Sequence, residues 1–496
     1  MSLTKVSYSM IQGAAYNVLD FGADNTGAVS SVAAFNAALL LGGTVYVPSG
    51  TYKLDSKVSL TVNNTTLWLA ANVTLNLSGV PATQVPFGTQ IHVIASNCAV
   101  IGSGPSSLLQ ITGGSQANAV GILHTAPGFT IRDLTIDGDK ANGTAISDDT
   151  FMSGISILCG AYGGATTDVQ ATVDNCVIKN FLQYGVSVYG DQANGVKIVN
   201  CNIRDIGKAG DALSVGGGIV VTRGVSDFIA SNNVIKNCKL DGMFLSSAGL
   251  DCGNWTITGN VCHQNGGSGI TFKESSAYSS ENNIGLFNIA VTGNTSTGNT
   301  RSGIELNVDT VGYLKYFSIT GNTCEGNTFS GIEVSCTNTT PNIISGIQIS
   351  GNLVLDNGSF QITIGQYVEA VQGVPQSFTP VIKGSTTAGV GTYTSQSGLY
   401  TYSNGIVYFE LVLDWSAHTG SGDILIAGFP YAGKNAEPQS TSWVWANGLT
   451  ITGQGVFSPT INATQGPLGA INNGNYSAVA LDTAATLRIT GFYFTN

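Results

Sequence analysis

Short segments in which apolar and polar residues alternate run along much of the chain and predict β-strands. Examples are residues 255–258, 317–320 and 332–334, where about every second residue is apolar. A period of two places successive side chains on opposite faces of a strand, so that one face of each segment is buried. No segment between residues 171 and 367 has helical periodicity, and this region is therefore expected to consist of β-structure.

One short phrase returns seven times between residues 171 and 367. Each copy has two Asn-type residues five positions apart, and most copies continue with a Gly and an alternating segment. The pairs are Asn175/Asn180, Asn200/Asp205, Asn232/Asn237, Asn260/Asn265, Asn294/Asn299, Asn322/Asn327 and Asn352/Asn357. The Gly residues are Gly185, Gly218, Gly242, Gly269, Gly303 and Gly331. Repeats of 20–50 residues indicate a solenoid, a propeller or an array.

The composition of the repeat favours a parallel β-helix among these architectures. The absence of helical segments argues against a leucine-rich horseshoe, and the Asn-Gly hairpin turns of propeller blades are not the dominant pattern. Asn tolerates left-handed backbone at corners, and identical amides on successive coils can stack into a ladder. We therefore assign the repeated Asn residues a structural role at the corners and no catalytic role.

The chain divides into three expected parts. Residues 1–40 form a lead-in and a capping helix, with Ser30 or Ser31 as N-cap and Gly42 as the stop. Residues 41–370 form the right-handed, single-stranded parallel β-helix, which has weaker repetition before residue 171. After a linker-like break at residues 374–380, long strands without helices predict a β-sandwich over residues 375–496. The fold class is all-β.

Composition and charge exclude several partners. The 496 residues include only 9% charged side chains, and the formal net charge is −11. A nucleic-acid partner is not expected, because phosphate binding needs a basic face. No apolar run approaches the roughly 18 residues of a membrane span, so no membrane insertion is expected. The first five residues lack the hydrophobic core of a secretion signal.

The nine cysteines are expected to be free and buried. Cys176 and Cys201 each follow a repeated Asn by one residue, whereas Cys262 and Cys324 follow one by two residues. This register suggests thiols stacked in a solenoid core. No Cys-x-x-Cys pair is present, so a zinc site is not expected. Free thiols fit a protein that folds in a reducing cytosol.

The segment of residues 16–52 carries a family resemblance. It contains YNVLDFGAD, a helix-favouring stretch and then GGTVYVPSGTY. This resembles the N-terminal signature of the pectate-lyase-like β-helix superfamily, and specifically its bacteriophage tailspikes, although Ser replaces the usual acidic residue before the helix. Residues 6–14 and the phrases at residues 391–400 and 415–420 are also similar to tailspike and tail-fibre segments.

The resemblance implies a function and an assembly. It implies a homotrimeric virion protein of the phage tail that assembles in the host cytoplasm and contacts tail or baseplate proteins. Such a protein binds and depolymerises a bacterial surface polysaccharide, either capsule or O-antigen. No cofactor and no metal are expected, and the C-terminal module would serve trimerisation or carbohydrate binding.

Two carboxylates in the repeat are the leading catalytic candidates. Glu305 and Glu333 each stand two residues after the repeated Gly, so stacked coils would bring them together. Like-charge repulsion would raise the pKa of one of them, and paired carboxylates suit glycoside hydrolysis. Glu274 and Asp309 are the replacement partners. The alternative is that Glu305 and Glu333 only keep an exposed sheet soluble.

Candidate substrate-binding residues lie on the same flank of the repeat. They are Arg301, Lys273, Asp241 and Tyr278. His263 is interpreted as a partly buried corner residue. The pair Asp148 and Asp149 lacks the companion motifs of polygalacturonases, and the calcium-binding Asp cluster of classical pectate lyases has no match.

Three functions remain open at this point. The first is a tailspike hydrolase, the second is a lyase that cleaves a uronate-containing polysaccharide by β-elimination, and the third is a non-catalytic receptor-binding adhesin. Release of reducing ends separates the two enzymes from the adhesin. Ultraviolet absorbance of an unsaturated product separates the lyase from the hydrolase.

Overall fold

The computed structural model places the chain in two compact units. It describes residues 14–78, 89–112, 118–123, 127–142, 153–159, 169–190, 193–208, 216–274, 284–308, 312–336, 344–365, 371–403, 405–434, 440–460 and 462–495. The first unit consists of Met1–Ile347 and Gly351–Glu369, and the second consists of Gln348–Ser350 and Ala370–Asn496.

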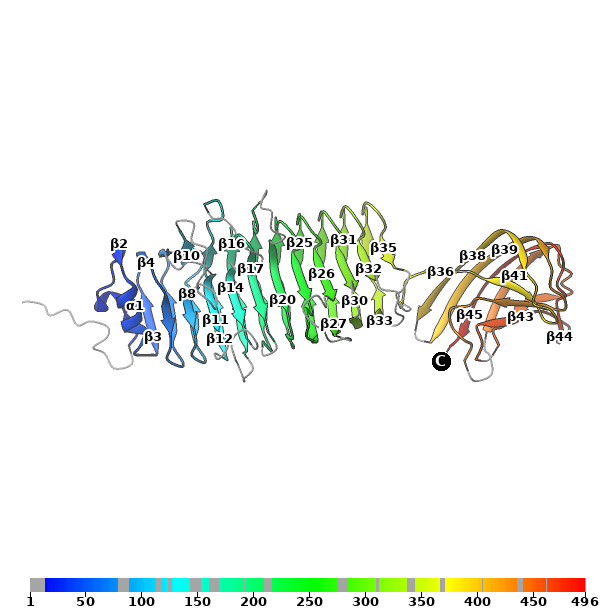
Figure 1. The fold of residues 1–496 in the computed structure, drawn as a ribbon, viewed down its shortest axis with the longest axis horizontal. Helices are drawn as coiled ribbons and strands as arrows, with labels where there is room; N and C mark the ends of the chain where they lie inside the picture. The colour runs from blue at the N-terminus through cyan, green and yellow to red at the C-terminus, as the bar shows by residue number, and fades with distance from the viewer. Residues whose placement is uncertain are drawn as a thin grey trace, which may run out of the picture. The chain divides into compact units, whose positions relative to one another are not determined.

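The first unit is a parallel β-helix with three sheets, A, B and C (Figure 1). Sheet A consists of β1 (Tyr16–Asn17), β3 (Thr44–Val47), β6 (Thr66–Leu69), β9 (Ala99–Ile101), β12 (Phe129–Arg132), β15 (Ala171–Asp174), β18 (Lys197–Val199), β21 (Ile229–Ser231), β24 (Cys252–Thr258), β27 (Gly285–Thr292), β30 (Tyr313–Thr320) and β33 (Ile344–Ser350). Sheet B consists of β2 (Thr26–Ser30), β4 (Gly50–Leu54), β7 (Val73–Leu77), β10 (Leu108–Ile111), β13 (Thr135–Asp137), β16 (Val177–Lys179), β19 (Asn202–Arg204), β22 (Val234–Lys236), β25 (Val261–His263), β28 (Thr295–Thr297), β31 (Thr323–Glu325) and β34 (Leu353–Leu355). Sheet C consists of β5 (Val58–Leu60), β8 (Thr89–Val93), β11 (Asn118–Leu123), β14 (Ser153–Leu158), β17 (Tyr184–Tyr189), β20 (Gly217–Thr222), β23 (Met243–Ser246), β26 (Ile270–Glu274), β29 (Ile304–Val308), β32 (Ile332–Cys336) and β35 (Ile362–Ile364).

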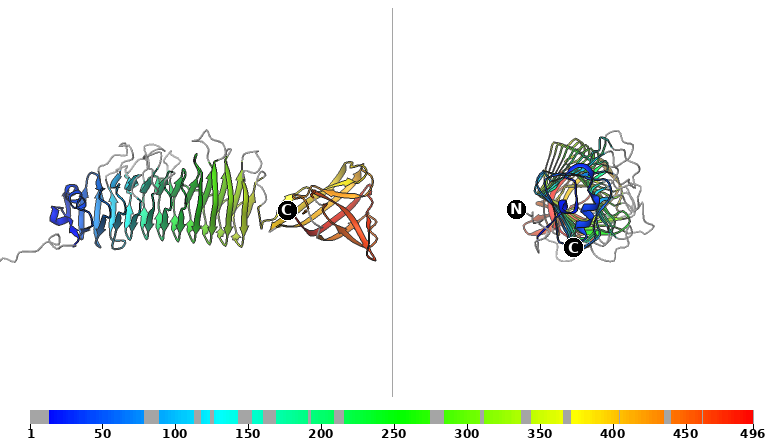
Figure 2. Two further views of the ribbon diagram at one scale, coloured as in Figure 1. Left: turned by 90° about the horizontal axis from the view of Figure 1, so that it is seen from below. Right: turned by 90° about the vertical axis from the view of Figure 1, so that its left-hand side faces the viewer.

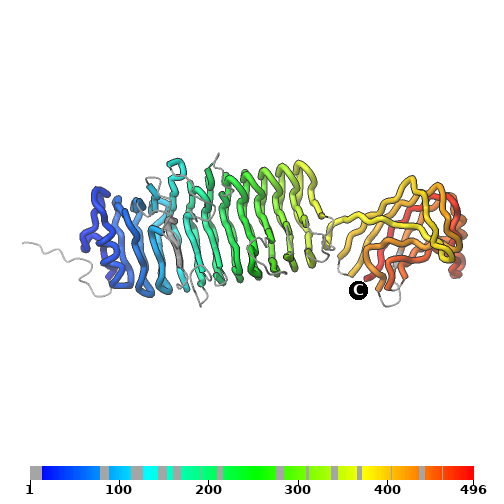
Figure 3. Tube along the Cα trace, in the orientation of Figure 1, coloured from blue at the N-terminus to red at the C-terminus, as the bar shows by residue number. Residues whose placement is uncertain are grey.

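Each coil after the first runs from sheet A through sheet B to sheet C, and in the first coil α1 follows β2 in place of a sheet C strand. Within every sheet the strands follow chain order, and neighbouring strands are parallel, as between β26 and β29. The end-on view in Figure 2 shows the coils of this unit superimposed, and Figure 3 traces the rise from one coil to the next. The expected fold class is confirmed.

The first coil begins earlier than residue 41. β1 pairs with β3, and β2 pairs with β4, so both strands belong to the parallel sheets. The expected helix is present as α1 (Val32–Leu39) after a 3-10 turn, η2 (Val18–Phe21). Phe35 of α1 packs edge-on against Tyr52 of β4, with ring centroids 5.6 Å apart. The helix therefore covers the apolar interior of the first coil.

Ser31 precedes the helix, but its side chain forms no capping hydrogen bond with α1. Its hydroxyl instead accepts from the backbone N–H of Asp24 at 2.9 Å. Backbone N–H groups of Val29, Thr26 and Ala28 and the Thr26 hydroxyl lower the pKa of Asp24 to about 2. Ser31 therefore occupies the expected N-cap position, but its hydroxyl binds the segment before β2 and does not cap α1.

The repeated Asn residues form two physically different sets. In the first three copies, the named pairs themselves have positive φ, as at Asn175 (φ 50) and Asn232 (φ 55). In the last four copies the residue before each named Asn takes that conformation, namely Gly259, Gln264, Gly293, Gly298, Gly321, Gly326, Gly351 and Asp356. The later Asn residues therefore lie one position beyond the corner, where most are buried.

Buried Asn side chains form two ladders along the unit. Asn294 Nδ2 donates to Asn322 Oδ1 at 2.9 Å and also to the carbonyl of Ile257. Asn294 Oδ1 accepts from the backbone N–H and the Nδ2 of Asn260. Asn265, Asn299, Asn327 and Asn357 repeat this pattern in the second ladder. Each amide thus satisfies polar groups of the adjacent coil, as buried polar groups require.

Apolar side chains fill the interior of the coils. Every second residue of the strands points inward. Inside the unit, the ring centroids of Phe272 and Phe317 lie 5.2 Å apart. All nine cysteines are free, and eight of them are buried. Burial raises the pKa of Cys238 and Cys252 to about 12, so these thiols act as small apolar residues.

The second unit consists of two antiparallel sheets, D and E. Sheet D has β36 (Gln376–Phe378), β38 (Gly391–Ser403), β39 (Ile406–His418), β45 (Ala485–Phe494) and β41 (Ser440–Asn447), in that order. Sheet E has β37 (Val381–Gly384), β40 (Ile424–Ala427), β43 (Gln465–Asn472) and β42 (Gln454–Phe457), with β44 (Asn475–Ala478) paired to β43. Phe409 of sheet D packs against Phe457 of sheet E, with ring centroids 5.8 Å apart. The two sheets thus enclose one core, as expected for a β-sandwich.

Removing one amide from a ladder should destabilise the β-helix strongly. In Asn294→Ala, the buried N–H groups of Asn260 and the carbonyl of Ile257 lose their partners. Each unsatisfied buried group costs about 1–3 kcal/mol, so we expect a loss of roughly 3 kcal/mol in the free energy of unfolding. Chemical denaturation followed by far-ultraviolet circular dichroism measures this loss. Lys197→Ala, at an exposed position of sheet A, is the control and should change stability little; an equal effect of both variants would contradict the ladder.

Candidate functional site

Variation in chain length is concentrated at the two ends of the sheet C strands. From β12 onward, every strand of sheet A is separated from the next strand of sheet B by two residues. The connections from sheet B to sheet C vary in length up to β20 and are constant after it. The connections from sheet C to sheet A vary in length along the unit. Inserted segments around a regular scaffold are where binding sites are usually built. Sheet C is therefore the face of the β-helix where a binding site is expected.

One outward column of sheet C carries the predicted carboxylates. Its members are paired strand by strand in the parallel register: Ser156, Ser187, Val220, Phe244, Thr271, Glu305, Glu333 and Thr363. Glu305 and Glu333 are direct neighbours, as the repeat predicted. Adjacent strands are about 4.8 Å apart, so the two side chains begin from neighbouring positions.

Serine hydroxyls from the turns before sheet C hold both carboxylates. Ser268 Oγ donates to Glu305 Oε2 at 2.6 Å, and Ser302 Oγ donates to Glu333 Oε2 at 2.6 Å. In each case the serine belongs to the preceding coil. Ser330 and Thr363 repeat the contact one coil later, with their hydroxyl oxygens 2.7 Å apart. Each outward side chain is therefore bound back to the turn of the preceding coil.

Glu305 is buried although it points out of the sheet. The residue is only 3% exposed to solvent. Its second oxygen, Oε1, accepts from the Arg301 guanidinium at 3.2 Å, and that arginine side chain is 55% exposed. The alternative in which Glu305 merely solvates an open sheet does not fit this burial. Glu333 is partly buried, so the two carboxylates lie in different environments.

Asp241 joins this cluster from the turn before β23. Its Oδ1 accepts the backbone N–H of Ser268 at 2.6 Å, so Ser268 bridges Asp241 and Glu305. Burial, and secondarily the charge of Glu305, raises the pKa of Asp241 to about 6, against the opposing effects of the Ser268 N–H and Arg301. The two hydrogen bonds keep the two carboxyl groups within about 9 Å of each other.

The remaining predicted residues fall in different places. Lys273 is outward in the next column of sheet C, in register with Asn307. Glu274 is instead inward and fully buried, because a strand alternates its faces and Lys273 takes the outward one. Glu274 is thus removed from the candidate set. Tyr278 and Asp309, like Asp148 and Asp149, lie outside the described residues.

His263 lies on sheet B and not with the carboxylates. It pairs with Thr297 in the parallel register, and burial lowers its pKa. It therefore takes no part in the cluster on sheet C.

Sequence reasoning missed the bridging role of the serines. The signal was present as a repeated triplet, Ser268-Gly269-Ile270, Ser302-Gly303-Ile304 and Ser330-Gly331-Ile332, in which Asp241 replaces Ser before Gly242. The Gly has no room for a side chain, because a Cβ at Gly303 would lie 2.5 Å from the carbonyl oxygen of Gly331. Asp241 therefore stands at the position that Ser occupies in the later coils, and it adds a carboxyl group to the cluster.

Neither a metal site nor a membrane-spanning helix is found among the described residues. In that part of the chain, no group of three or more His, Cys, Asp or Glu side chains could hold a metal ion. No helix in the same part is long and apolar enough to cross a membrane.

Comparison with known proteins identifies the architecture. A family model described as a right-handed β-helix region matches residues 118–286. The first unit is a right-handed β-helix. The crystal structure of the Dettilon tailspike protein has a TM-score of 0.62 at 15% identity, over 97% of this chain and 94% of that chain. The expected likeness to tailspikes is thereby confirmed for the fold.

Two curated relatives match part of the chain. The mannuronan C5-epimerase AlgE1 of Azotobacter vinelandii is 27% identical over 271 residues, which are 53% of this chain and 16% of the relative. Alginate lyase 7 of the same organism is 28% identical over 222 residues, which are 42% of this chain and 22% of the relative. The chain thus spans less than a quarter of the length of either relative.

The raised pKa of Asp241 predicts a pH-dependent effect of Asp241→Asn on stability. The folded protein binds the proton more tightly than the unfolded chain, whose carboxyl has a pKa of 3.8. The Asp241 carboxylate therefore destabilises the fold increasingly as pH rises from about 4 to above 6. We expect Asp241→Asn to melt close to wild type at pH 4 and at a higher temperature at pH 8, because Asn keeps the oxygen that accepts from Ser268. Melting curves of both proteins between pH 4 and 8 measure this, and parallel curves would refute it.

Proposed function

We propose that this protein binds and depolymerises a bacterial surface polysaccharide on sheet C of its β-helix. The observation that carries the proposal is the cluster in which Ser268 bridges Asp241, with its pKa of about 6, and the buried Glu305. A protonated carboxyl beside a charged carboxylate is the pairing that glycoside hydrolysis needs. The parallel register adds an outward row of side chains along which an extended sugar chain can lie.

In the proposed mechanism, Asp241 is the general acid for the leaving oxygen, and Glu305 is the base that activates the water molecule attacking the anomeric carbon, or is itself the nucleophile that water later displaces. A carboxyl with a pKa near 6 remains partly protonated close to neutral pH and can donate to the leaving glycosidic oxygen. Arg301 and Ser268 hold Glu305 in place by hydrogen bonding to both of its oxygens. Ser268 joins the two carboxyl groups through one backbone and one side-chain hydrogen bond, so both can face the same glycosidic bond. Glu333, the next member of the column, would bind hydroxyl groups of the substrate. This proposal replaces the catalytic pair Glu305 and Glu333 that the repeat predicted.

The cations near the cluster favour an acidic sugar. Arg301 is largely exposed, and Lys273 points outward from the adjacent coil. In a chain of net charge −11, these two cations are the groups near the cluster that would attract a uronate. The named activities of the relatives, on mannuronan and alginate, agree with a polysaccharide substrate of this kind.

A lyase is the second candidate, favoured by the partial match to alginate lyase 7. In β-elimination a base removes the proton next to the uronate carboxyl, the glycosidic bond breaks, and the leaving oxygen takes a proton from water, which leaves a double bond in the product. Arg301 would neutralise the uronate, and Asp241 in its ionised form would be the base. Only this reaction yields a product that absorbs in the ultraviolet, so absorbance decides between the two reactions. A non-catalytic receptor-binding adhesin is the third candidate.

The proposal includes a place in the phage particle. The fold likeness to a tailspike supports a position on the virion tail, where the chain would assemble with tail proteins in the host cytoplasm and recognise the cell surface. On this proposal the polysaccharide is both the receptor and the substrate.

Substitutions in the cluster test the mechanism. We expect Asp241→Asn and Glu305→Gln each to reduce turnover at least about 100-fold, because general acid–base groups contribute 10²–10⁴-fold. Glu333→Gln should reduce it less than about tenfold. The measurement is release of reducing ends from purified capsular and O-antigen polysaccharides, with absorbance recorded in parallel. Glu325→Gln, exposed on sheet B, is the matched control and should behave as wild type.

The outcomes separate the candidate functions. Wild-type rates in Asp241→Asn and Glu305→Gln would refute the assignment of the cluster. Binding without any cleavage by the wild-type protein would favour the adhesin.

A homotrimer is the expected assembly of a tailspike. Light scattering on the full chain at micromolar concentration should give three times the mass of 51.0 kDa. A monomer mass under these conditions would contradict the expected assembly.

A further inference from the structure

The outer face of sheet D carries an exposed aromatic surface that the proposed function does not use. Trp443 is 81% exposed, Trp445 is 54% exposed and Tyr408 is 50% exposed. These residues alternate with the inward residues of the sandwich core, such as Leu411 and Ile489. Large aromatic side chains gathered on a surface mark an interaction site more often than isolated ones do.

The strand register places polar groups between these aromatic residues. One row across the sheet runs Leu399, Glu410, Thr490 and Trp443, and the next runs Ser397, Val412, Arg488 and Trp445. Each row spans three strand spacings, or about 14 Å. Tyr408 and Phe492 stand in the row on the other side of Glu410 and Thr490, with ring centroids 6.0 Å apart.

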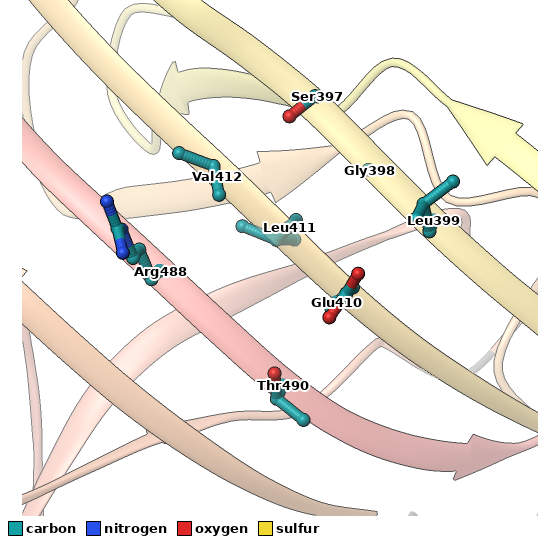
Figure 4. Close-up of a pocket in the computed structure, with 8 residues that line it drawn as sticks. All are labelled: Ser397, Gly398, Leu399, Glu410, Leu411, Val412, Arg488 and Thr490. Atoms are coloured by element: carbon teal, nitrogen blue, oxygen red, sulfur yellow. The ribbon is translucent and has the colours of Figure 1, made fainter.

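A hollow of about 270 Å³ opens in the middle of these two rows (Figure 4). It is lined by Ser397, Gly398, Leu399, Glu410, Leu411, Val412, Arg488 and Thr490. Arg488 lies 5.6 Å from the centre of the Trp445 ring, which holds the guanidinium at the edge of the hollow. Among the described residues, Glu410 has no ion-pair partner. The hollow therefore offers a carboxylate, a guanidinium and hydroxyl groups beside flat aromatic rings.

We propose that this surface, formed by Trp443, Trp445, Glu410, Thr490 and Arg488, is a non-catalytic binding site for a polysaccharide segment. A sugar ring has an apolar face that stacks on an indole and a rim of hydroxyls that pair with carboxylate and guanidinium groups. The hollow places a carboxylate, a guanidinium and the hydroxyls of Ser397 and Thr490 close together, which suits the closely spaced hydroxyl groups of a sugar chain. A hydroxylated chain in a shallow hollow satisfies Glu410 while leaving it partly in water.

The site goes beyond the proposed function, because it needs no chemistry on sheet C. Its effect would be to add a second attachment point for the same long chain. Two linked sites bind a polymer more tightly than either site alone, since the second contact becomes intramolecular.

Affinity electrophoresis of the full chain tests the proposal. The gels contain alginate or purified capsular and O-antigen polysaccharides, and every protein carries Glu305→Gln so that the chains are not consumed. We expect at least one polysaccharide to retard the parent protein. Adding Trp443→Ala together with Trp445→Ala should weaken that binding about tenfold, and adding Glu410→Gln alone should weaken it to a smaller extent. Both tryptophans are largely exposed, so the variants should fold.

Controls separate this site from the one on sheet C. Tyr476→Ala, an exposed aromatic position on β44 of sheet E, should leave binding unchanged. The two Trp substitutions placed in a chain with Glu305 intact should leave cleavage of short oligosaccharides near the wild-type rate, if the protein cleaves them. Loss of cleavage alone would affect the proposed function and not this site.

Three results would overturn the inference. They are unchanged retardation of the double Trp variant, no retardation of the parent protein by any polysaccharide, and a reduced oligomeric mass of the double Trp variant in light scattering. The last result would assign the surface to contact between copies of the chain.

Discussion

The β-helix depends on satisfying buried backbone groups from one coil to the next. Parallel strands pair only with neighbouring coils, and the corners between sheets leave N–H and C=O groups inside the unit. Asn260, Asn294 and Asn322 close these gaps, because each amide reaches a carbonyl of one neighbouring coil and an amide of the other. From β12 onward the corner between sheets A and B is two residues long in every coil, while the segments at the ends of sheet C vary in length.

The same stacking brings identical side chains together and creates the electrostatic problem of the site. A carboxylate repeated in successive coils faces another carboxylate about 4.8 Å away. The chain relieves this with the hydroxyls of Ser268 and Ser302 and with the guanidinium of Arg301, each of which donates to a specific oxygen. Where the turn carries Asp241 in place of Ser, burial favours the neutral acid. A regular scaffold thereby acquires two carboxyl groups of different character within one cluster.

The second unit is stabilised differently and exposes a different surface. Its two antiparallel sheets bury a continuous core of aromatic and aliphatic residues, including Phe409, Phe429 and Phe457. Because the strands alternate faces, the same strands of sheet D carry Tyr408 and Trp443 outward. Polar residues on the outer face of sheet D would be enough to maintain the fold. The exposed aromatic residues there are therefore consistent with the proposed binding site.

The sequence by itself determined the architecture, because the period-two alternation and the repeat are local properties of the chain. It also placed Glu305 and Glu333 in register, since equal spacing from the repeated Gly carries one position onto the next. It did not separate the corner residues Asn175 and Asn232 from the ladder residues Asn260 and Asn294, because a shift of one residue changes burial without changing the pattern.

Only the tertiary structure decided which acidic groups belong together. Glu274 is adjacent to Lys273 in sequence but points into the core. Asp241 lies 64 residues before Glu305 and reaches it through Ser268. The burial and the neighbours that raise the pKa of a carboxyl come from different coils. These contacts exist only once the coils are stacked, and the order of residues along the chain does not contain them.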